Sequence, residues 1–328
     1  MKVLAMTTDG RLTYCSAPPE SRGRGRCNHV FHQNENESSE EFIKRVTGDL
    51  LEYASDNQKE DITSIDDFQK LKMVENHENL DILINDKSWE IRKAIAEQGY
   101  GLEKLVDDKE WRVRMAVAEQ GSGLDRLVND ENYNVRISVV KRGYGLDKLV
   151  NDEDWHVRRA VARQGYGLDK LINDEDSDVR TAVADQGYGL DKLVNDKDWQ
   201  VRVAVAERNY DLNRLVNDED WHVRMTVAKQ GYGLDQLNND EDRYVREAVV
   251  DQGYKLDEFI NDKDWFIRAA VARQGYGLEK LVNDEEPGVR MAVAQQGYGL
   301  DKLVNDGDWE VRRAVTEQGY GLEESIKR

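Results

Sequence analysis

The sequence is constrained most by an arginine that returns with a strict 22-residue period. Eleven arginines keep this spacing without slippage, and we call them the ladder arginines: Arg92, Arg114, Arg136, Arg158, Arg180, Arg202, Arg224, Arg246, Arg268, Arg290 and Arg312. Self-similarity at a fixed period is the signature of a repeat architecture, in which each repeat packs on its neighbours. We therefore expect eleven repeats rather than the two or three ordinary domains that 328 residues would otherwise suggest.

Each repeat is predicted to contain two helices. The residue four before the arginine is mostly Asp, which accepts hydrogen bonds at a helix start, and in one repeat Pro287 follows it at the first helical position. Seven residues after the arginine stands Gly, or Asn209 in one repeat, which tolerates the left-handed conformation that ends a helix. Beyond a Tyr-Gly turn, Leu168, Leu171 and Ile172 stand at i, i+3 and i+4, which predicts a short α or 3₁₀ segment.

The apolar residues of one repeat are too few to stabilise it alone. Val157, Ala160 and Val161 mark the core face of the longer helix, but their burial does not offset the entropy of ordering a whole repeat. Neighbouring repeats must therefore stack, and we predict a mostly α-helical fold, an α-solenoid of eleven two-helix repeats. We place it at residues 80–328 with a polar C-terminal cap, after a capping segment at 71–79 and a small α+β module at 1–70.

An aspartate stands six residues before every ladder arginine, and we call these the ladder aspartates. We expect the aspartate and arginine of successive repeats to form ion pairs along the stack. The alternative is a row of calcium sites at acidic runs such as Asp152-Glu153-Asp154, but the runs lack the mid-loop glycine and closing glutamate of calcium loops. Representative ladder residues are Asp86, Arg92, Asp152, Arg158, Asp218, Arg224, Asp306 and Arg312.

The repeated residues resemble two known repeat families. The run Asn-Asp-x-Asp-x-x-Val-Arg-x-Ala-Val-Ala resembles the second helix of HEAT-type repeats, and the 22-residue repeat with leucines in a brief segment resembles the bacterial leucine-rich repeat variant family. The resemblance covers residues 80–322 and implies alternating α and 3₁₀ helices stacked into a superhelix that serves as a binding surface. One type in that family carries a cysteine-ligated iron–sulfur cluster, which two cysteines do not support here.

The least uniform positions indicate where a partner would bind. Relative to the ladder arginine, positions −2, +1 and +5 fall on one stripe of the longer helix. Mixed chemistry there is expected of a surface that recognises a partner, and equally of a surface under no constraint. We expect the anchors to be richest around Met225, Tyr244 and Phe266. The candidate partner-binding residues are Met115, His156, His222, Met225, Tyr244, Phe266 and Met291.

All seven tryptophans stand at one position, three residues before a ladder arginine. Three residues apart on a helix is the same face, so we expect aromatic–cation stacking between repeats at this position.

Residues 1–70 follow a different pattern. Residues 2–8 and 11–16 read as two short β-strands around Asp9-Gly10, a hairpin signal. A loop with Arg22, Arg24 and Arg26 follows, and an amphipathic helix is predicted at about residues 39–54.

Both cysteines and two of the five histidines lie in this N-terminal region. Cys15, Cys27, His29 and His32 offer two thiolates and two imidazoles, a tetrahedral set suited to one structural zinc ion, although the spacing lacks a Cys-x-x-Cys pair. The alternatives are a nucleophilic Cys27 activated by His29 or His32, and plain reduced thiols.

The charge balance narrows the class of partner. With 47 Lys and Arg against 66 Asp and Glu, the formal charge is −19, so the repeats are not expected to bind the phosphate backbone of nucleic acids. No apolar run approaches the length of a membrane span. We expect a cytoplasmic, bacterial, monomeric and non-enzymatic scaffold that binds a protein partner. The alternatives are an enzyme centred on Cys27, with the solenoid presenting substrate, and a nucleic-acid contact through the N-terminal arginines.

Overall fold

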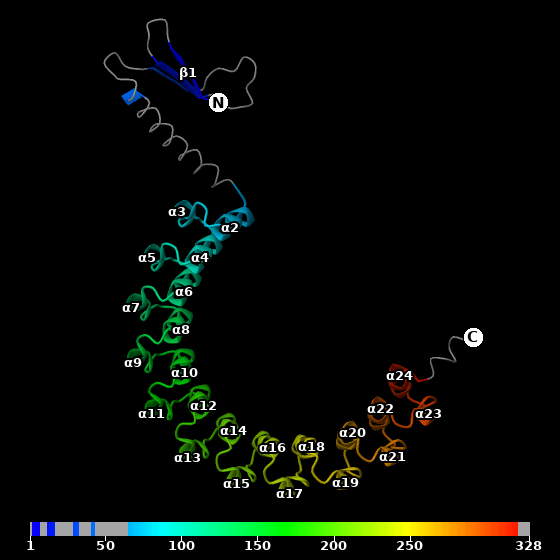
Figure 1. Cartoon of the computed structure of the whole chain (residues 1–328). Coiled ribbons are helices and arrows are strands. Elements are labelled where there is room, and N and C mark those ends of the chain that lie inside the picture. The colour runs from blue at the N-terminus through cyan, green and yellow to red at the C-terminus, as the bar shows by residue number, and fades with distance from the viewer. Residues whose placement is uncertain (1, 7–11, 17–28, 33–40, 43–64, 321–328) are drawn as a thin grey trace, which may run out of the picture. The chain divides into compact units, whose positions relative to one another are not determined.

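The computed structural model describes residues 2–6, 12–16, 29–32, 41–42 and 65–320 (Figure 1). The chain divides into two compact units, Met1–Gly123 and Leu124–Arg328. The described residues are mostly helical, and their helices recur with the 22-residue period of the ladder arginines. The predicted array of helical repeats is therefore confirmed.

Three short strands lie at the N-terminal end of the first unit. They are β1 (Lys2–Met6), β2 (Leu12–Ser16) and β3 (His29–His32), which pair antiparallel in the order β1-β2-β3. The pairing of β1 with β2 is the one that the Asp9-Gly10 signal predicts, although that turn lies outside the described residues. The helix expected at residues 39–54 also lies outside them, apart from Glu41 and Phe42, so the α+β module as a whole stays a prediction.

The repeat contacts of the first unit begin earlier than the sequence predicts. Its helices are α2 (Asp67–Glu75), α3 (Leu80–Leu83), α4 (Trp89–Glu97), α5 (Leu102–Leu105) and α6 (Trp111–Glu119). Lys70 of α2 stands one repeat period before Arg92, and its Nζ lies 2.9 Å from Oδ2 of the ladder aspartate Asp86. Lys70 thus takes the place of a ladder arginine. The helices α2 and α3 form a divergent repeat that spans the domain boundaries predicted at residues 70 and 79.

Over its described residues, 124–320, the second unit alternates nine short helices with nine long ones. The short helices are α7 (Leu124–Leu127), α9 (Leu146–Leu149), α11 (Leu168–Leu171), α13 (Leu190–Leu193), α15 (Leu212–Leu215), α17 (Leu234–Leu237), α19 (Leu256–Phe259), α21 (Leu278–Leu281) and α23 (Leu300–Leu303). The long helices are α8 (Tyr133–Lys141), α10 (Trp155–Arg163), α12 (Ser177–Asp185), α14 (Trp199–Glu207), α16 (Trp221–Lys229), α18 (Arg243–Asp251), α20 (Trp265–Arg273), α22 (Pro287–Gln295) and α24 (Trp309–Glu317).

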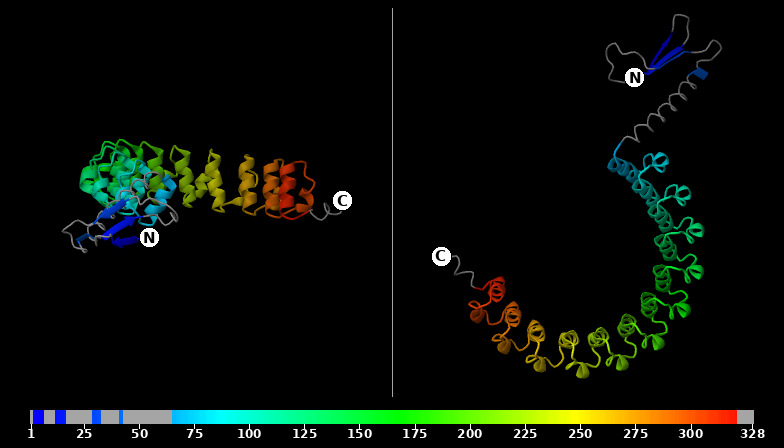
Figure 2. Two further views of the ribbon diagram at one scale, coloured as in Figure 1. Left: turned by 90° about the horizontal axis from the view of Figure 1, so that it is seen from above. Right: turned by 180° about the vertical axis from the view of Figure 1, so that it is seen from behind.

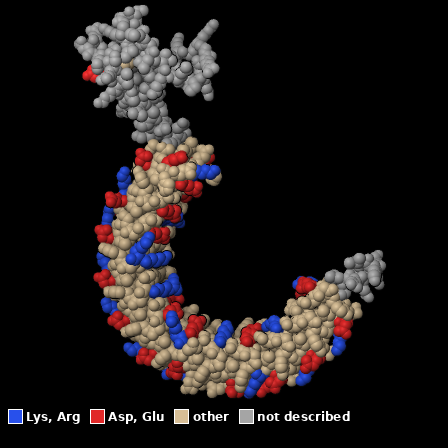
Figure 3. Space-filling view, viewed as in Figure 1, with Lys and Arg blue, Asp and Glu red and all other residues tan. Residues whose placement is uncertain are grey.

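Within this second unit the long helices stand side by side on the concave side and the short helices on the convex side (Figures 1 and 2). The core lies between the two rows, where Leu149, Val157 and Val161 are almost fully buried. Lysine and aspartate pairs of the short helices, such as Asp169 and Lys170, reach solvent. Basic and acidic side chains accordingly alternate along the convex edge of this unit (Figure 3).

The long helices begin and end as their sequences predict. The Asp154 side chain accepts a hydrogen bond from the backbone N–H of His156, and most other aspartates at this position do the same. The longer side chains of Glu110 and Glu286 make no such cap. The short helices are single α turns, because Val150 N–H donates to the Leu146 carbonyl, with i to i−3 bonds on either side.

A second glycine, nine residues after the ladder arginine, sets how closely a repeat approaches its neighbour. Gly145 has φ of +62°, and a Cβ there would lie 2.6 Å from Cγ2 of Val128 in the preceding repeat. Glycine combines the left-handed conformation with that close approach at no steric cost. Asp211 and Lys255 replace this glycine in two repeats and retain positive φ.

Candidate functional site

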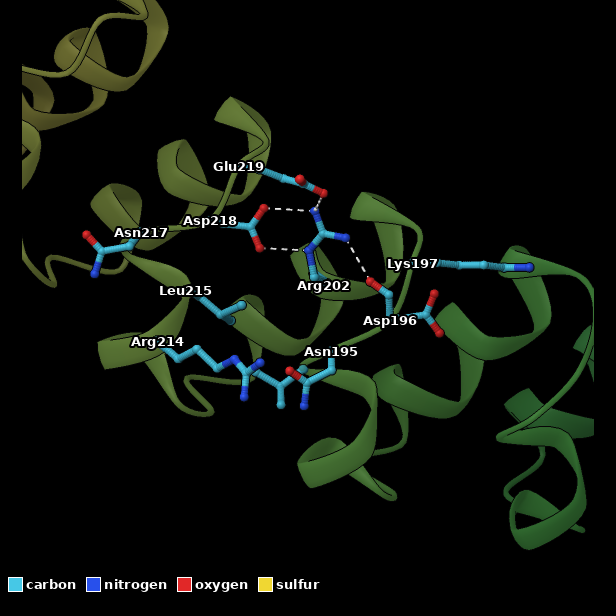
Figure 4. Close-up of a pocket in the computed structure, with 10 residues that line it drawn as sticks. Asn195, Asp196, Lys197, Arg202, Arg214, Leu215, Asn217, Asp218 and Glu219 are labelled. Atoms are coloured by element: carbon cyan, nitrogen blue, oxygen red, sulfur yellow. Dashed lines mark hydrogen bonds and ion pairs between the residues drawn. The ribbon is translucent and has the colours of Figure 1, made fainter.

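The ladder residues form a closed network at the loops that precede the long helices (Figure 4). Arg202 Nε and Nη2 donate to the two carboxylate oxygens of Asp218 at 2.7 and 2.8 Å, and Nη1 donates to the Asp196 carbonyl at 2.7 Å. The Asp218 carboxylate also accepts from the backbone N–H of Asp220 at 2.9 Å. Both side chains are about nine-tenths buried, so the pair is shielded from solvent.

The same pairing between successive repeats recurs along the chain. Within the two units it joins Arg92 to Asp108, Arg136 to Asp152, Arg158 to Asp174, Arg180 to Asp196, Arg202 to Asp218, Arg224 to Asp240, Arg246 to Asp262, Arg268 to Asp284 and Arg290 to Asp306. Arg312, in the last long helix, donates only to backbone carbonyls of Asp306 and Gly307. Among the described residues, Thr181 Oγ1 is the one buried side-chain polar atom without a partner, so the ladder leaves none of its buried polar atoms free for a ligand.

The network shifts the pKa of several of its members toward their charged forms. Hydrogen bonding from Arg290 lowers the pKa of Asp306, against an opposing effect of burial and with help from the Asp308 backbone N–H. Hydrogen bonding to Asp218 raises the pKa of Arg202 in the same way. These shifts indicate a structural role for the ladder, because each charge stabilises its partner.

The tryptophans stack on cations, but these are not the ladder arginines. Arg112, at position −2, lies between two tryptophans, with its Cζ 5.0 Å from the Trp89 ring centroid and 4.5 Å from that of Trp111. Arg159, at position +1, lies 4.7 Å from the Trp155 ring. The ladder arginines are instead engaged with aspartates, so the prediction of stacking between repeats was right and its implied partner was wrong.

In the second unit, six rings of α14, α16, α18 and α20 form a continuous series of stacked and edge-on contacts that we call the aromatic stripe: Trp199, Trp221, His222, Tyr244, Trp265 and Phe266. The His222 ring lies between two indoles, 4.1 Å from Trp199 and 3.6 Å from Trp221. The Tyr244 ring stacks on Trp221 and meets the edge of Phe266. At 100° per residue, positions −3, −2 and +1 face away from the short helices, hence toward the concave side.

The structure brings some of the predicted partner-binding residues together and separates others. His222, Tyr244 and Phe266 belong to the aromatic stripe, and Met225 is partly exposed on α16 at position +1. Met291 is partly exposed at the same position on α22. The remaining two candidates lie elsewhere: His156 stacks between Tyr133 and Trp155, and Met115 belongs to the first unit.

Charged side chains surround the Phe266 end of the stripe. The guanidinium groups of Arg243 and Arg273 lie 5.3 and 5.6 Å from the Phe266 ring centroid, and Arg273 also pairs with Glu247 at 3.1 Å. Burial and the like charge of Asp251 raise the pKa of Glu247. The stripe therefore combines exposed aromatic faces with a few charges at defined places.

The N-terminal candidates lie largely outside the described residues. Cys27 is among those omitted, as are the three loop arginines, and for Cys15, His29 and His32 only the strand register is described, in which Cys15 is opposite Val30. In the part of the chain that the structure describes, no group of three or more His, Cys, Asp and Glu residues is placed to hold a metal ion. Neither the zinc site nor the nucleophilic thiol is tested, and both stay predictions.

A row of tyrosines, all exposed except the half-buried Tyr254, was not among the predicted surface features. Ten repeats carry tyrosine eight residues after the ladder arginine: Tyr100, Tyr144, Tyr166, Tyr188, Tyr210, Tyr232, Tyr254, Tyr276, Tyr298 and Tyr320. Their 22-residue period was visible in the sequence. The Tyr166 backbone N–H donates to the Val161 carbonyl, the bond that closes a helix end in a Schellman motif, so the position has a structural role.

Comparisons with known proteins do not identify a family. No protein-family model matches the chain, and no curated protein matches it either. The resemblance to HEAT-type and leucine-rich repeat variant families therefore stays a prediction. Within the described residues, no helix has the length and apolar character needed to cross a membrane.

Proposed function

We propose that the chain is a non-enzymatic scaffold whose aromatic stripe binds a protein partner. The observation that carries this proposal is the continuous series of contacts among six partly exposed rings on the concave side of the second unit. Tryptophan, tyrosine and methionine are among the residue types enriched in protein–protein interfaces.

The contrast with the ladder supports the proposal. The ladder repeats the same two residues and satisfies their polar groups internally, whereas the stripe varies at position −2, where His222, Tyr244 and Phe266 stand, and keeps ring surface in solvent. Tyr244 is 40% exposed and Trp265 is 43% exposed, although both could have been covered by longer neighbours. Such rings cover a partner's apolar surface at small cost in side-chain entropy because they have only two rotatable bonds.

A pair of matched double variants tests the proposal. The chain is used to capture proteins from a lysate of its source organism, and the captured set is identified by mass spectrometry. Tyr244→Ala with Phe266→Ala should lose the partner. Tyr188→Ala with Tyr210→Ala removes two rings at the other tyrosine position, each about as exposed as Tyr244, and should keep it. Retention of the same partner by the stripe variant, with both variants folded by circular dichroism, would overturn the proposal.

A further inference from the structure

Trp265 differs from the other six tryptophans of the chain. Each of the others stacks with an arginine or a histidine: Trp89 and Trp111 with Arg112, Trp155 with His156 and Arg159, Trp199 and Trp221 with His222, and Trp309 with Arg313. Among the described residues, Trp265 makes a ring contact only with Phe266, edge-on at 6.1 Å. The Trp265 indole therefore lacks the basic group that stacks on each of the other six tryptophans.

The first unit shows how such a group is held. The Arg112 guanidinium lies between the rings of Trp89 and Trp111, and its Nη1 donates to Glu110 Oε1 at 2.7 Å. Glu110 occupies the N-cap of α6 and makes no side-chain cap, and its carboxylate binds the arginine. This site combines an aromatic face with an acceptor for the guanidinium N–H groups.

The pair α20 and α22 reproduces this arrangement without the arginine. By the 22-residue period, Trp265 corresponds to Trp89, Glu286 to Glu110 and Gly288 to Arg112. The apolar Pro287 stands at the position of the second tryptophan, Trp111. Glu110 and Glu286 are the only glutamates at this N-cap position in the repeats. The Glu286 side chain also makes no cap, and its carboxylate has no hydrogen-bond or ion-pair partner within the described part of the chain.

Small neighbours keep the indole of Trp265 accessible. Gly288 has no side chain to cover it, and a Cβ at that position would lie 2.7 Å from Trp265 Cζ3, so the indole leans over the glycine. In α20, the helix that carries Trp265, position +1 is the short Ala269. In α10 the same position is Arg159, whose guanidinium lies over the equivalent Trp155. The result is an indole that is 43% exposed, with the unpaired Glu286 carboxylate at the position that Glu110 takes relative to Trp89.

We propose that this notch, formed by Trp265, Glu286, Pro287 and Gly288, binds the guanidinium group of an arginine from the protein partner. The guanidinium lies on the indole and donates to the Glu286 carboxylate, as Arg112 does within the first unit. Arginine fits better than lysine because its planar, weakly hydrated group both stacks on a ring and donates through a fork of N–H groups. The inference rests on the proposed function, since it names one side chain that the stripe recognises.

A peptide titration tests the notch without the partner. The full chain is labelled with 5-fluorotryptophan, and the resonance of residue 265 is assigned with Trp265→Phe. The peptide acetyl-Gly-Arg-Gly-amide should shift that resonance saturably, whereas the neutral citrulline peptide of the same shape should leave it in place. Glu286→Gln should weaken the binding about tenfold, because one charge-assisted hydrogen bond is reduced to a neutral one.

A second variant fills the notch from within. Gly288→Arg restores the side chain found at the equivalent position of the first unit, and arginine also favours a helix more than glycine does. The variant should abolish the peptide-induced shift. If it does not fold, Glu286→Gln alone decides the question.

The proposal is overturned by a shift of equal size with the citrulline peptide, by unchanged affinity in Glu286→Gln, or by no shift at residue 265. If the titration fails while capture still depends on Tyr244 and Phe266, only the arginine site is wrong. If the titration succeeds while capture is independent of those two rings, only the proposed function is wrong.

Discussion

The ladder and the aromatic stripe use the same long helices in opposite ways. At the ladder, Arg202 meets two carboxylate oxygens and a carbonyl, and Asp218 meets the arginine and a backbone N–H, so both groups are saturated. At the stripe, rings contact one another and still keep exposed faces. The comparison teaches that the same helices hold the repeats together through saturated, buried polar groups and keep ring surface in solvent on another face.

Removal of one ladder arginine should have the largest effect. Arg202→Ala leaves the buried Asp218 carboxylate without its charged partner, which is expected to cost about 3–5 kcal/mol in local unfolding free energy. Arg312→Ala is the matched control, because Arg312 is exposed and donates only to carbonyls, and it should cost less than about 1.5 kcal/mol. Hydrogen exchange of the flanking helices measures both, and equal losses would show that the ladder pair is not structural.

Acid should weaken the ion pairs of the ladder. The Arg290 hydrogen bond lowers the pKa of Asp306. Burial raises the pKa of Asp108, Asp196 and Asp284, but hydrogen bonds from their arginines and from backbone N–H groups outweigh it, so these values are lowered too. A group with a depressed folded-state pKa contributes stability that is present above the unfolded value, about 3.9 for Asp, and is lost as the pH falls through the folded value.

Urea unfolding between pH 7 and pH 3 should therefore show a stable plateau and then a decline below about pH 5. Glu247, whose pKa is raised, acts in the opposite direction at a single position and should not reverse the trend. Stability that is unchanged or higher at pH 3 would contradict the assignment.

Substitutions at the N-cap position of the long helices should have the smallest effects on the unfolding free energy. They should also distinguish a residue that caps its helix from one that does not. Asp220 caps α16 by accepting from the His222 backbone N–H, so Asp220→Ala should lower the unfolding free energy by about 1 kcal/mol. Glu286 makes no cap, so Glu286→Ala should change it by less than about 0.5 kcal/mol. Thermal melts of the two variants give the comparison, and a similar loss in both would argue against a free Glu286 carboxylate.

Periodicity alone predicts much of this fold. The 22-residue spacing of Arg and Asp predicted the repeats and the pairing between neighbours, and the Asp and Gly positions predicted where long helices begin and end. It did not predict the α2 repeat, where Lys70 replaces arginine and the expected glycines are His77 and Asn79, both with positive φ. A search for any basic residue at the 22-residue spacing, and not for arginine alone, would have found this repeat.

The stacking partners could not be read from sequence positions. Trp89 and Arg112 belong to successive repeats, and their contact depends on how far one long helix is turned relative to the next. The sequence placed tryptophan and the ladder arginine on one helical face, which is correct within a repeat, but the ladder arginine is held by the aspartate of the following repeat. The ladder arginine binds the aspartate and not the tryptophan ring, because the carboxylate accepts two parallel hydrogen bonds from its guanidinium.

Site-specific photocrosslinking tests the central claim, that the partner binds the concave stripe, most directly. A benzophenone amino acid replaces Met225 on the concave side or Lys192 on a convex short helix, and the chain is irradiated in lysate of its source organism. The account predicts a discrete adduct from position 225 that the Tyr244→Ala and Phe266→Ala double variant abolishes, and none of that mass from position 192. The same adduct from position 192, with none from position 225, would contradict it.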